Sequence, residues 1–237
     1  MISLQNITWA GNNGTILSDQ VINIAPGECI VFVGGPDTGK TTLIGLLTGE
    51  RKPKSGSILI DGIPLEKLPP RLLQIYRRSL GFMLQKDQLL SDRSVAEQIA
   101  LPLEVRGFHK EEIPAHVFEI LQKASLAERR TALPDALTLG EKQRTALAQA
   151  IATDPKIFLL DEPLPKEIDE KSKTVILAML QTALSRGASV IVVTRNAETI
   201  SSLRPREVHL EKELSIGESP KTLWKKSEGT RIMPVSL

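Results

Sequence analysis

The hydrophobic residues of this chain fall into two patterns that alternate along the sequence. Short apolar runs next to glycine, proline or a charged residue predict β-strands, as in CIVFVGG, IFLL and ASVIVVT. Apolar residues spaced three and four apart predict helices, as in KTTLIGLLTG, which ends at Gly49, and in a later helix that ends at Gly187. Alternation of this kind is typical of a mostly parallel sheet with helices on both faces. We therefore expect an α/β fold.

The amino-terminal part is predicted to be mainly β. Residues 2–8 alternate, which places Ile2, Leu4 and Asn6 on one face of a strand. The stretch QVINIAPGE puts another strand before a Pro-Gly turn, and GSILIDG and LGFMLQ predict two more. Near the other end of the chain, REVHLEKELSI has the pattern of a closing hairpin.

Residues from about 91 to 153 interrupt this order with a helical pattern. Pro114 suits a first helical turn, and Gly107 suits a helix end. The apolar residues at helical spacing are Val95, Ile99 and Leu103, followed by Val117, Ile120, Leu121 and Ala124. We expect one domain over residues 1–216 with this helical subdomain inserted in it. Residues 217–237 lack periodicity and predict a flexible tail, in which Trp224 beside two lysines either touches a membrane surface or is simply solvated.

Composition and charge limit the function only broadly. The formal net charge is +2, so charge alone gives no reason to expect a nucleic-acid partner. Cys29 is the one cysteine, so the chain cannot form an internal disulfide, and we expect a reducing compartment. We expect the Cys29 side chain to be buried in a strand, where it packs as a small hydrophobic residue. The first residues lack the pattern of a signal peptide, and the apolar runs are far shorter than the roughly 20 residues that span a bilayer. We expect any membrane role to come through a partner.

The stretch GGPDTGKTT carries the strongest chemical signal. Gly34, Gly39, Lys40 and Thr41 fit the pattern G-x-x-x-x-G-K-[ST] between a predicted strand and a predicted helix. The glycines let successive N–H groups point at phosphate oxygens, Lys40 reaches the β- and γ-phosphates, and the Thr41 hydroxyl ligates Mg²⁺. We call residues 34–42 the phosphate loop. Its expected ligand-binding residues are Gly34, Gly35, Asp37, Thr38, Gly39, Lys40, Thr41 and Thr42.

A second candidate site is IFLLDEP. Asp161 ends an apolar strand, where a carboxylate can hold Mg²⁺, and Glu162 follows it, placed to polarise an attacking water. The alternative is an acidic pair that caps the next helix.

With these motifs in this order, the chain resembles the ATP-binding subunit of an ABC transporter from residue 1 to about residue 215. The resemblance implies a P-loop NTPase with a RecA-like core, ATP and Mg²⁺ as ligands, and a dimer on the cytoplasmic face of the cell membrane beneath an integral membrane permease-like subunit. LGFMLQ matches the segment that ends in the glutamine of this family, so Gln85 is expected to contact Mg²⁺ or the attacking water; otherwise it is a polar surface residue.

Within the family, the chain is similar to the subgroup of FtsE, the cell-division ATPase, with the lipoprotein-release and macrolide-export ATPases. The stretch RRSLGFMLQKDQLLSDRSVAEQIALPLEVRG carries this similarity, since FtsE has a very similar LL-x-DR-(T/S)-V run followed by an A-x-PL helix. The similarity implies an FtsX-like membrane partner.

The chain departs from the family in the signature loop, which we define as residues 137–141. The family has L-S-G-G-(Q/E), whereas this chain has LTLGE. In an ABC dimer this loop closes on the γ-phosphate held by the other subunit. Thr138 keeps the hydroxyl and Gly140 keeps one glycine, but Leu139 replaces a glycine and is expected to crowd the ligand or force another φ.

Further departures lie at Arg195, Trp9 and the segment after Glu162. Arg195 replaces a histidine that contacts the γ-phosphate in the family; it either stabilises phosphate charge or is solvated. The family stacks adenine on a tyrosine near Gly11, so Trp9 is either that platform or a core residue. The family segment P-T-S-x-L-D is PLPKEID here, in which Pro165 stiffens the loop.

The altered residues lie in the signature loop and at position 195, while Gly39, Lys40, Thr41, Gln85, Asp161 and Glu162 are intact. We expect ATP binding with slow hydrolysis, in a homodimer or a heterodimer of ATPase subunits, with Glu162, Gln85 and Arg195 as catalytic residues. Two alternatives remain: a nucleotide-dependent scaffold with little turnover, and the degenerate half of a heterodimer.

Overall fold

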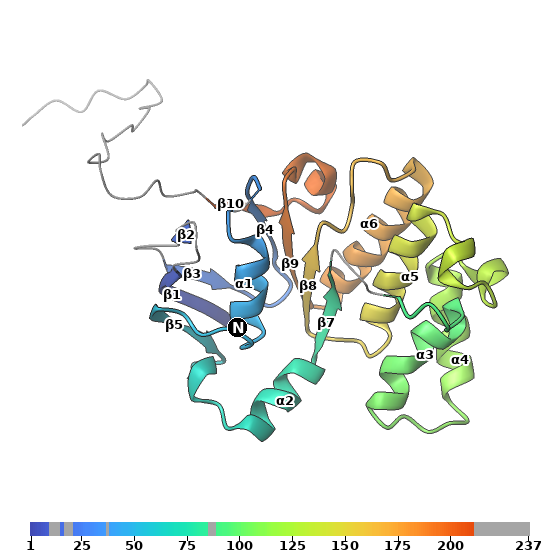
Figure 1. Ribbon diagram of the computed structural model, residues 1–237, viewed down its shortest axis with the longest axis horizontal. Helices are drawn as coiled ribbons and strands as arrows, with labels where there is room; N and C mark the ends of the chain where they lie inside the picture. Colours follow the sequence, from blue (N-terminus) through green and yellow to red (C-terminus); the bar gives the residue numbers. More distant parts are fainter. Residues whose placement is uncertain (10–14, 17–20, 37, 85–88, 211–237) are drawn as a thin grey trace, which may run out of the picture.

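The structure is a computed structural model that describes residues 1–9, 15–16, 21–36, 38–84 and 89–210 (Figure 1). The strands are β1 (Ile2–Trp9), β2 (Thr15–Ile16), β3 (Val21–Ile24), β4 (Cys29–Val33), β5 (Ser55–Ile60), β6 (Ile63–Pro64), β7 (Leu80–Met83), β8 (Ile157–Asp161), β9 (Ser189–Thr194) and β10 (Arg206–His209). The helices are α1 (Lys40–Leu47), α2 (Pro70–Arg78), α3 (Val95–Val105), α4 (Ile113–Lys123), α5 (Leu139–Ile151) and α6 (Glu170–Ser185). Short 3₁₀ helices cover Leu65–Lys67, Ala127–Arg129, Pro134–Ala136 and Ala197–Leu203.

The central sheet is parallel and has the order β10-β4-β9-β8-β7. Its middle strands are buried along almost their whole length, because both faces are covered. All six residues of β9 are buried. The predicted parallel α/β core is confirmed.

A separate antiparallel sheet is formed by the amino-terminal strands, in which β1 pairs with β2, β3 and β5. The alternation predicted for residues 2–8 holds for Ile2 and Leu4 but is wrong for Asn6. The pairing of β1 with β5 shifts register between Gln5 and Thr8, and Asn6 there has φ +49° and is exposed. This irregularity moves the next buried position to Ile7.

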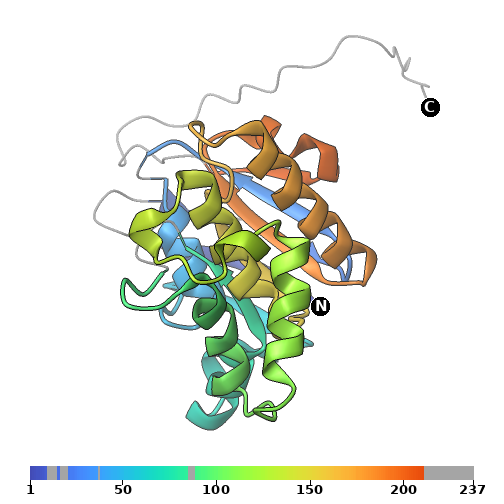
Figure 2. The same cartoon turned by 90° about the vertical axis from the view of Figure 1, so that its right-hand side faces the viewer.

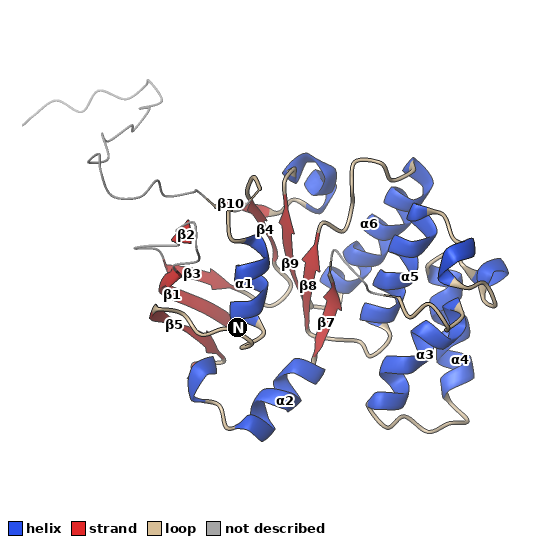
Figure 3. Ribbon diagram, viewed as in Figure 1, coloured by secondary structure: helices blue, strands red, loops and turns tan. Residues whose placement is uncertain are grey.

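The hydrophobic core lies on both faces of the parallel sheet. On one face α1 packs between the two sheets, with Phe32, Leu43 and Leu47 fully buried. On the other face the helical subdomain and α6 cover the sheet, as Figure 2 shows for α3 and α4 in green and α6 in orange. In Figure 3 the strands of both sheets are red and the helices around them are blue. The helical segment predicted between residues 91 and 153 thus corresponds to α3, α4 and α5.

Local sequence explains where the inserted helices begin and end. Ser94 caps α3 in a reciprocal capping box with Glu97, and Gly107, just past its end, has φ +79°. Pro114 lies in the first turn of α4, as predicted.

Some elements differ from the sequence patterns. Helix α2 was not predicted, although Leu72, Ile75 and Tyr76 have helical spacing; of its residues only Tyr76 is buried. Strand β10 pairs in parallel with β4, and the second half of the predicted closing hairpin lies outside the described residues, as does the tail. Cys29 is buried in β4, as expected. Among the described residues, none of the helices is long and apolar enough to cross a membrane.

Candidate nucleotide-binding site

The candidate site is at the edge of the parallel sheet where β4, β9 and β8 end. Val33 of β4 pairs with Thr194 of β9, and Val193 pairs with Asp161 of β8. The carboxyl ends of parallel strands meet at one edge of a sheet, where ligands of α/β proteins bind. The register therefore brings together the phosphate loop, residues 194–195 and the Asp161–Glu162 pair, although they are far apart in sequence.

The phosphate loop has the tight geometry that its glycines predict. Gly39 has φ +85° and precedes α1 directly. A Cβ on Gly34 would lie 2.2 Å from Oγ1 of Thr38, which itself donates a hydrogen bond to the Gly35 carbonyl at 3.0 Å. The Gly34 N–H donates to the carbonyl oxygen of Thr194 at 3.1 Å. The loop is thus closed on itself and tied to β9.

Lys40 lies at the start of α1 and folds back over the loop. Its Nζ donates to the Gly34 carbonyl at 2.8 Å and also to the Gly35 carbonyl. The first turn of α1 carries no acidic residue that would oppose an anion. A polyphosphate group fits this arrangement for three reasons. The loop offers an ammonium group and a helix N-terminus, and it has no room for a side chain at Gly34.

The other predicted residues of this loop are only partly described. Thr41 is exposed in the first turn of α1, and Thr42 accepts a hydrogen bond from Arg51 at 3.3 Å. Asp37 and Gln85 lie outside the described residues, and so does the side chain of Trp9, whose backbone ends β1. Their predicted roles stay predictions.

Asp161 ends β8 and is 6% exposed. Burial raises the pKa of Asp161, the neighbouring Glu162 charge adds to this, and the positive charges of Lys40 and Arg195 oppose it. The charge of Lys40 therefore acts on Asp161. This is expected where a lysine binds phosphate next to a carboxylate that binds Mg²⁺. The alternative that the acidic pair caps the next helix is wrong, because Asp169 caps α6 and accepts from the Ser172 N–H at 2.8 Å.

Glu162 is held by the end of β9. Its backbone has φ +49°, and its N–H donates to the Val193 carbonyl at 2.9 Å. Its Oε2 accepts from Oγ1 of Thr194 at 2.8 Å, and its Oε1 accepts from the Arg195 N–H at 3.0 Å. The Arg195 Nε lies 3.6 Å from the same Oε1. Thr194 was not singled out from the sequence, since a threonine after an apolar strand carries no distinct signal.

The signature loop begins α5. Thr138 is the N-cap: its Oγ1 accepts from the Glu141 N–H at 3.2 Å, and the Glu141 carboxylate accepts from the Thr138 N–H at 2.9 Å. The hydrogen bond from the Thr138 N–H lowers the pKa of Glu141. A hydrogen bond from Arg129 at 2.9 Å lowers it further, by a smaller amount. Leu139 is the first helical residue and is 42% exposed. Leu139 does not have a positive φ, so its side chain sits on ordinary helical backbone, and the expected crowding of the ligand stays a prediction.

Gly140 packs directly against the start of α6. A Cβ added there would lie 2.0 Å from Oδ2 of Asp169 and 2.2 Å from Oγ of Ser172. Arg144, one turn later, donates to Oγ of Ser172 at 3.1 Å and to the carbonyls of Ala124 and Ser125. The signature loop is thus connected by direct contacts to the segment that follows Glu162.

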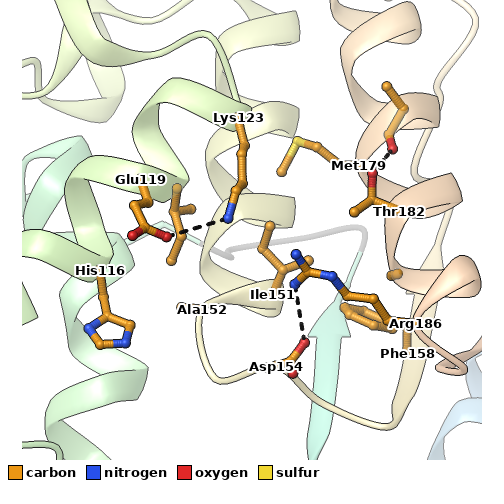
Figure 4. A pocket seen from close by; sticks show the side chains of 13 residues that line it. His116, Glu119, Lys123, Ile151, Ala152, Asp154, Phe158, Met179, Thr182 and Arg186 are labelled. Carbon is orange, nitrogen blue, oxygen red and sulfur yellow. Dashed lines mark hydrogen bonds and ion pairs between the residues drawn. The ribbon is translucent and has the colours of Figure 1, made fainter.

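A crevice of about 410 Å³ lies elsewhere, between α4, α5, α6 and the beginning of β8 (Figure 4). Its floor is apolar, with Ile151, Phe158 and Met179 among its lining residues. At its rim, Lys123 pairs with Glu119 and Arg186 pairs with Asp154. It contains none of the predicted site residues, so it is distinct from the candidate nucleotide site.

Comparison with known proteins identifies the family. Residues 17–165 match the family model described as "ABC transporter". The chain belongs to the ABC transporter family. Its fold is that of an ABC-type P-loop NTPase, and membership supports ATP hydrolysis with ATP and Mg²⁺ as ligands. In the described part of the chain, no group of three or more His, Cys, Asp or Glu residues could hold a metal. Mg²⁺ does not need such a group, because in nucleotide sites it is bound by one or two protein groups together with phosphates.

Curated relatives of this ABC protein are named methionine import ATP-binding proteins. MetN of Haemophilus influenzae (strain 86-028NP) is 34% identical over 86% of the chain, and MetN of Clostridioides difficile (strain 630) is 30% identical over 98%. The chain spans 60% of the former and 73% of the latter. These relatives do not support the predicted FtsE subgroup.

A solved structure is similar over nearly the whole ABC domain. The chain is 28% identical to the ATP-binding cassette MJ0796, determined as a dimer in a post-hydrolysis state bound to ADP and Pi. The TM-score is 0.78, and the match covers 90% of this chain and 95% of that one.

Proposed function

We propose that the chain is the ATP-binding and ATP-hydrolysing subunit of an ABC transporter-like membrane complex, and that it hydrolyses ATP slowly. The arrangement at the ends of β4, β9 and β8 carries the proposal. The charge of Lys40 acts on Asp161, Glu162 follows on the same strand end, and Gly34 is bonded to Thr194.

The residues have complementary roles in this proposal. Lys40 and the N–H groups of the phosphate loop hold the β- and γ-phosphates, while Glu162 orients the attacking water. Thr41, Asp161 and Gln85 would hold Mg²⁺, which would supply positive charge to neutralise the phosphates. Thr138 and Gly140 of a second subunit contact the γ-phosphate, and Trp9 stacks on the base.

Slow hydrolysis is supported by two features. The Arg195 guanidinium, in the position that matches the family's histidine, lies 3.6 Å from Oε1 of Glu162, the group that orients water in this proposal. Leu139 adds an exposed side chain where the family has glycine. The same features support the second candidate, a scaffold or degenerate half-site that closes on ATP with little turnover.

The proposal also includes a membrane partner and a location at the membrane. Membership of the ABC transporter family supports an integral membrane permease as partner, with this chain on the inner face of the cell membrane. The names of the relatives support a role in methionine import. An FtsE-like role with an FtsX-like partner is supported only by the similarity of residues 77–107.

The test is Mg²⁺-dependent phosphate release by the purified chain, beside ATP affinity. Lys40→Ala is expected to lose ATP binding, whereas Glu162→Gln is expected to bind ATP and lose turnover by roughly 10²-fold or more. Glu119→Gln, on the rim of the remote crevice, is the matched control and should be unaffected. ATP binding without turnover in the wild type would favour the scaffold, and absence of ATP binding would refute both candidates.

A further inference from the structure

Thr194 contacts both halves of the candidate site. It is the last residue of β9 and is 3% exposed. Its carbonyl oxygen accepts from the Gly34 N–H of the phosphate loop at 3.1 Å, and its Oγ1 donates to Oε2 of Glu162 at 2.8 Å. One buried residue thus connects the loop that holds phosphate with the carboxylate that follows β8.

The surroundings of Thr194 fix the direction of its hydroxyl proton. The Asn196 N–H donates to Oγ1 at 3.2 Å, so the oxygen already serves as an acceptor there. An ionised carboxylate can only accept, and Glu162 Oε2 is the nearer acceptor, because the Asn196 carbonyl lies 3.5 Å away. The hydroxyl therefore donates to Glu162, in a charge-assisted hydrogen bond of the stronger kind.

The backbone of Glu162 is unusual at the same place. A non-glycine residue at φ +49° is uncommon and persists only where its surroundings hold it. Here the Val193 carbonyl accepts from the Glu162 N–H at 2.9 Å, and the Arg195 N–H donates to Oε1. Among these hydrogen bonds, only the one from the Thr194 hydroxyl comes from a side chain, so a substitution at position 194 can remove it and leave the backbone contacts in place.

We infer that Thr194 is the positioning residue for Glu162, and that its hydroxyl sets where the carboxylate lies relative to the phosphate loop. The inference rests on the proposed function, which takes Glu162 as the group that orients water. Thr194 contacts Gly34 through its backbone carbonyl, which every substitution at position 194 retains. Loss of the hydroxyl should therefore affect turnover and leave nucleotide binding intact.

The test compares Thr194→Val with Thr194→Ser. Valine has nearly the shape of threonine and lacks the hydroxyl, whereas serine keeps it. Thr194→Val is expected to lower kcat roughly 10- to 100-fold with KM for ATP within about threefold of the wild type, because a carboxylate misplaced by about 1 Å loses this much rate. Thr194→Ser is expected to restore most of kcat. The matched control is Thr48→Val, which removes another buried threonine hydroxyl, one that donates to the Gly45 carbonyl at 3.2 Å.

Two results would overturn the inference. One is a kcat for Thr194→Val equal to that of Thr48→Val. The other is a parallel loss of ATP affinity and thermal stability that serine does not restore, which would mean a merely structural role.

A second measurement needs no turnover and separates this inference from the proposed function. Hydrogen exchange of the Arg195 amide, measured by NMR without nucleotide, reports whether the Glu162 carboxylate is still held. Thr194→Val is expected to speed this exchange roughly tenfold and Thr48→Val is not. Unchanged exchange would overturn the inference. If Glu162→Gln keeps full turnover but the exchange responds as expected, the proposed role of Glu162 fails while the positioning by Thr194 stands.

Discussion

The backbone N–H and the guanidinium of Arg195 both face one oxygen of Glu162, at 3.0 Å and 3.6 Å. The Glu162 side chain is 12% exposed and the Arg195 side chain is 60% exposed, so the ion pair lies at the surface of the site. An exposed pair of this kind contributes about 0–1 kcal/mol to stability. Because the sequence motif matches Arg195 to a histidine of the family, we propose that the pair matters for the orientation of Glu162.

Leu139→Gly is expected to raise the rate of ATP hydrolysis, by roughly tenfold, because it returns a small residue to the place where a second subunit approaches phosphate. Glycine in the first turn of α5 should also lower stability by up to about 1 kcal/mol. Steady-state phosphate release and thermal unfolding measure the two effects.

Leu133→Gly is the control for this change, since Leu133 is a similarly exposed leucine at 47% that precedes a 3₁₀ helix outside the signature loop. It should leave turnover unchanged. Equal turnover in the wild type and Leu139→Gly would remove Leu139 as a cause of slow hydrolysis.

Gly140→Ala is expected to destabilise the protein by about 1–3 kcal/mol, because its Cβ would overlap Asp169 and Ser172 at the start of α6. Gly45→Ala in α1 is the contrast. The three atoms nearest to its Cβ would belong to the Arg51 side chain, at 3.1 Å or more, so alanine there should be neutral or stabilise by up to about 1 kcal/mol. Urea unfolding of both variants tests this, and equal midpoints would contradict the tight packing at Gly140.

Alkaline pH is expected to weaken the fold through Cys29. Burial, with a smaller contribution from Glu28, raises the pKa of the Cys29 thiol from 9.0 to about 12. Above pH 9 the unfolded chain loses a proton that the folded protein keeps, so the free energy of unfolding falls as pH rises, by at most about 1.4 kcal/mol per pH unit. Below pH 9 this contribution is constant.

The measurement is the urea midpoint between pH 8 and pH 10.5 for the wild type and Cys29→Ala. The variant should lose stability less steeply above pH 9. Burial also raises the pKa of Tyr76, but in both proteins, so its effect cancels in the difference. Parallel pH profiles would show that the thiol ionises as easily in the folded protein as in the unfolded chain.

The sequence predicted those parts of the fold that depend on neighbouring residues. The strand, glycine loop and helix around Lys40 form one continuous signal, and the apolar spacing of Val95, Ile99 and Leu103 marks α3 without reference to the rest of the chain. Helix α2 was missed although Leu72, Ile75 and Tyr76 have helical spacing, and it buries only Tyr76. The register shift near Asn6 depends on pairing with β5, which no local pattern in β1 reveals.

The contacts that define the site were less predictable, because they join distant segments. Gly140 looks like a permissive position in the sequence, but its neighbours at the start of α6 leave no room for a side chain. The hydrogen bond from Thr194 to Glu162 joins residues 32 positions apart and depends on the strand order. The subgroup was predicted from residues 77–107, whereas the curated relatives were matched over most of the chain and have another named role.

The claim that hydrolysis is slow depends most on Arg195, which we propose acts on the reaction through Glu162. A double-mutant cycle of single-turnover ATP hydrolysis tests it most directly, with the wild type, Arg195→His, Glu162→Gln and the double variant. Arg186→His is the control, since Arg186 is an exposed arginine whose partner, Asp154, lies at the remote crevice. Arg195→His is expected to raise the rate roughly tenfold where Glu162 is present and to have no effect in the Glu162→Gln background. An equal effect in both backgrounds, or none in either, would contradict the claim.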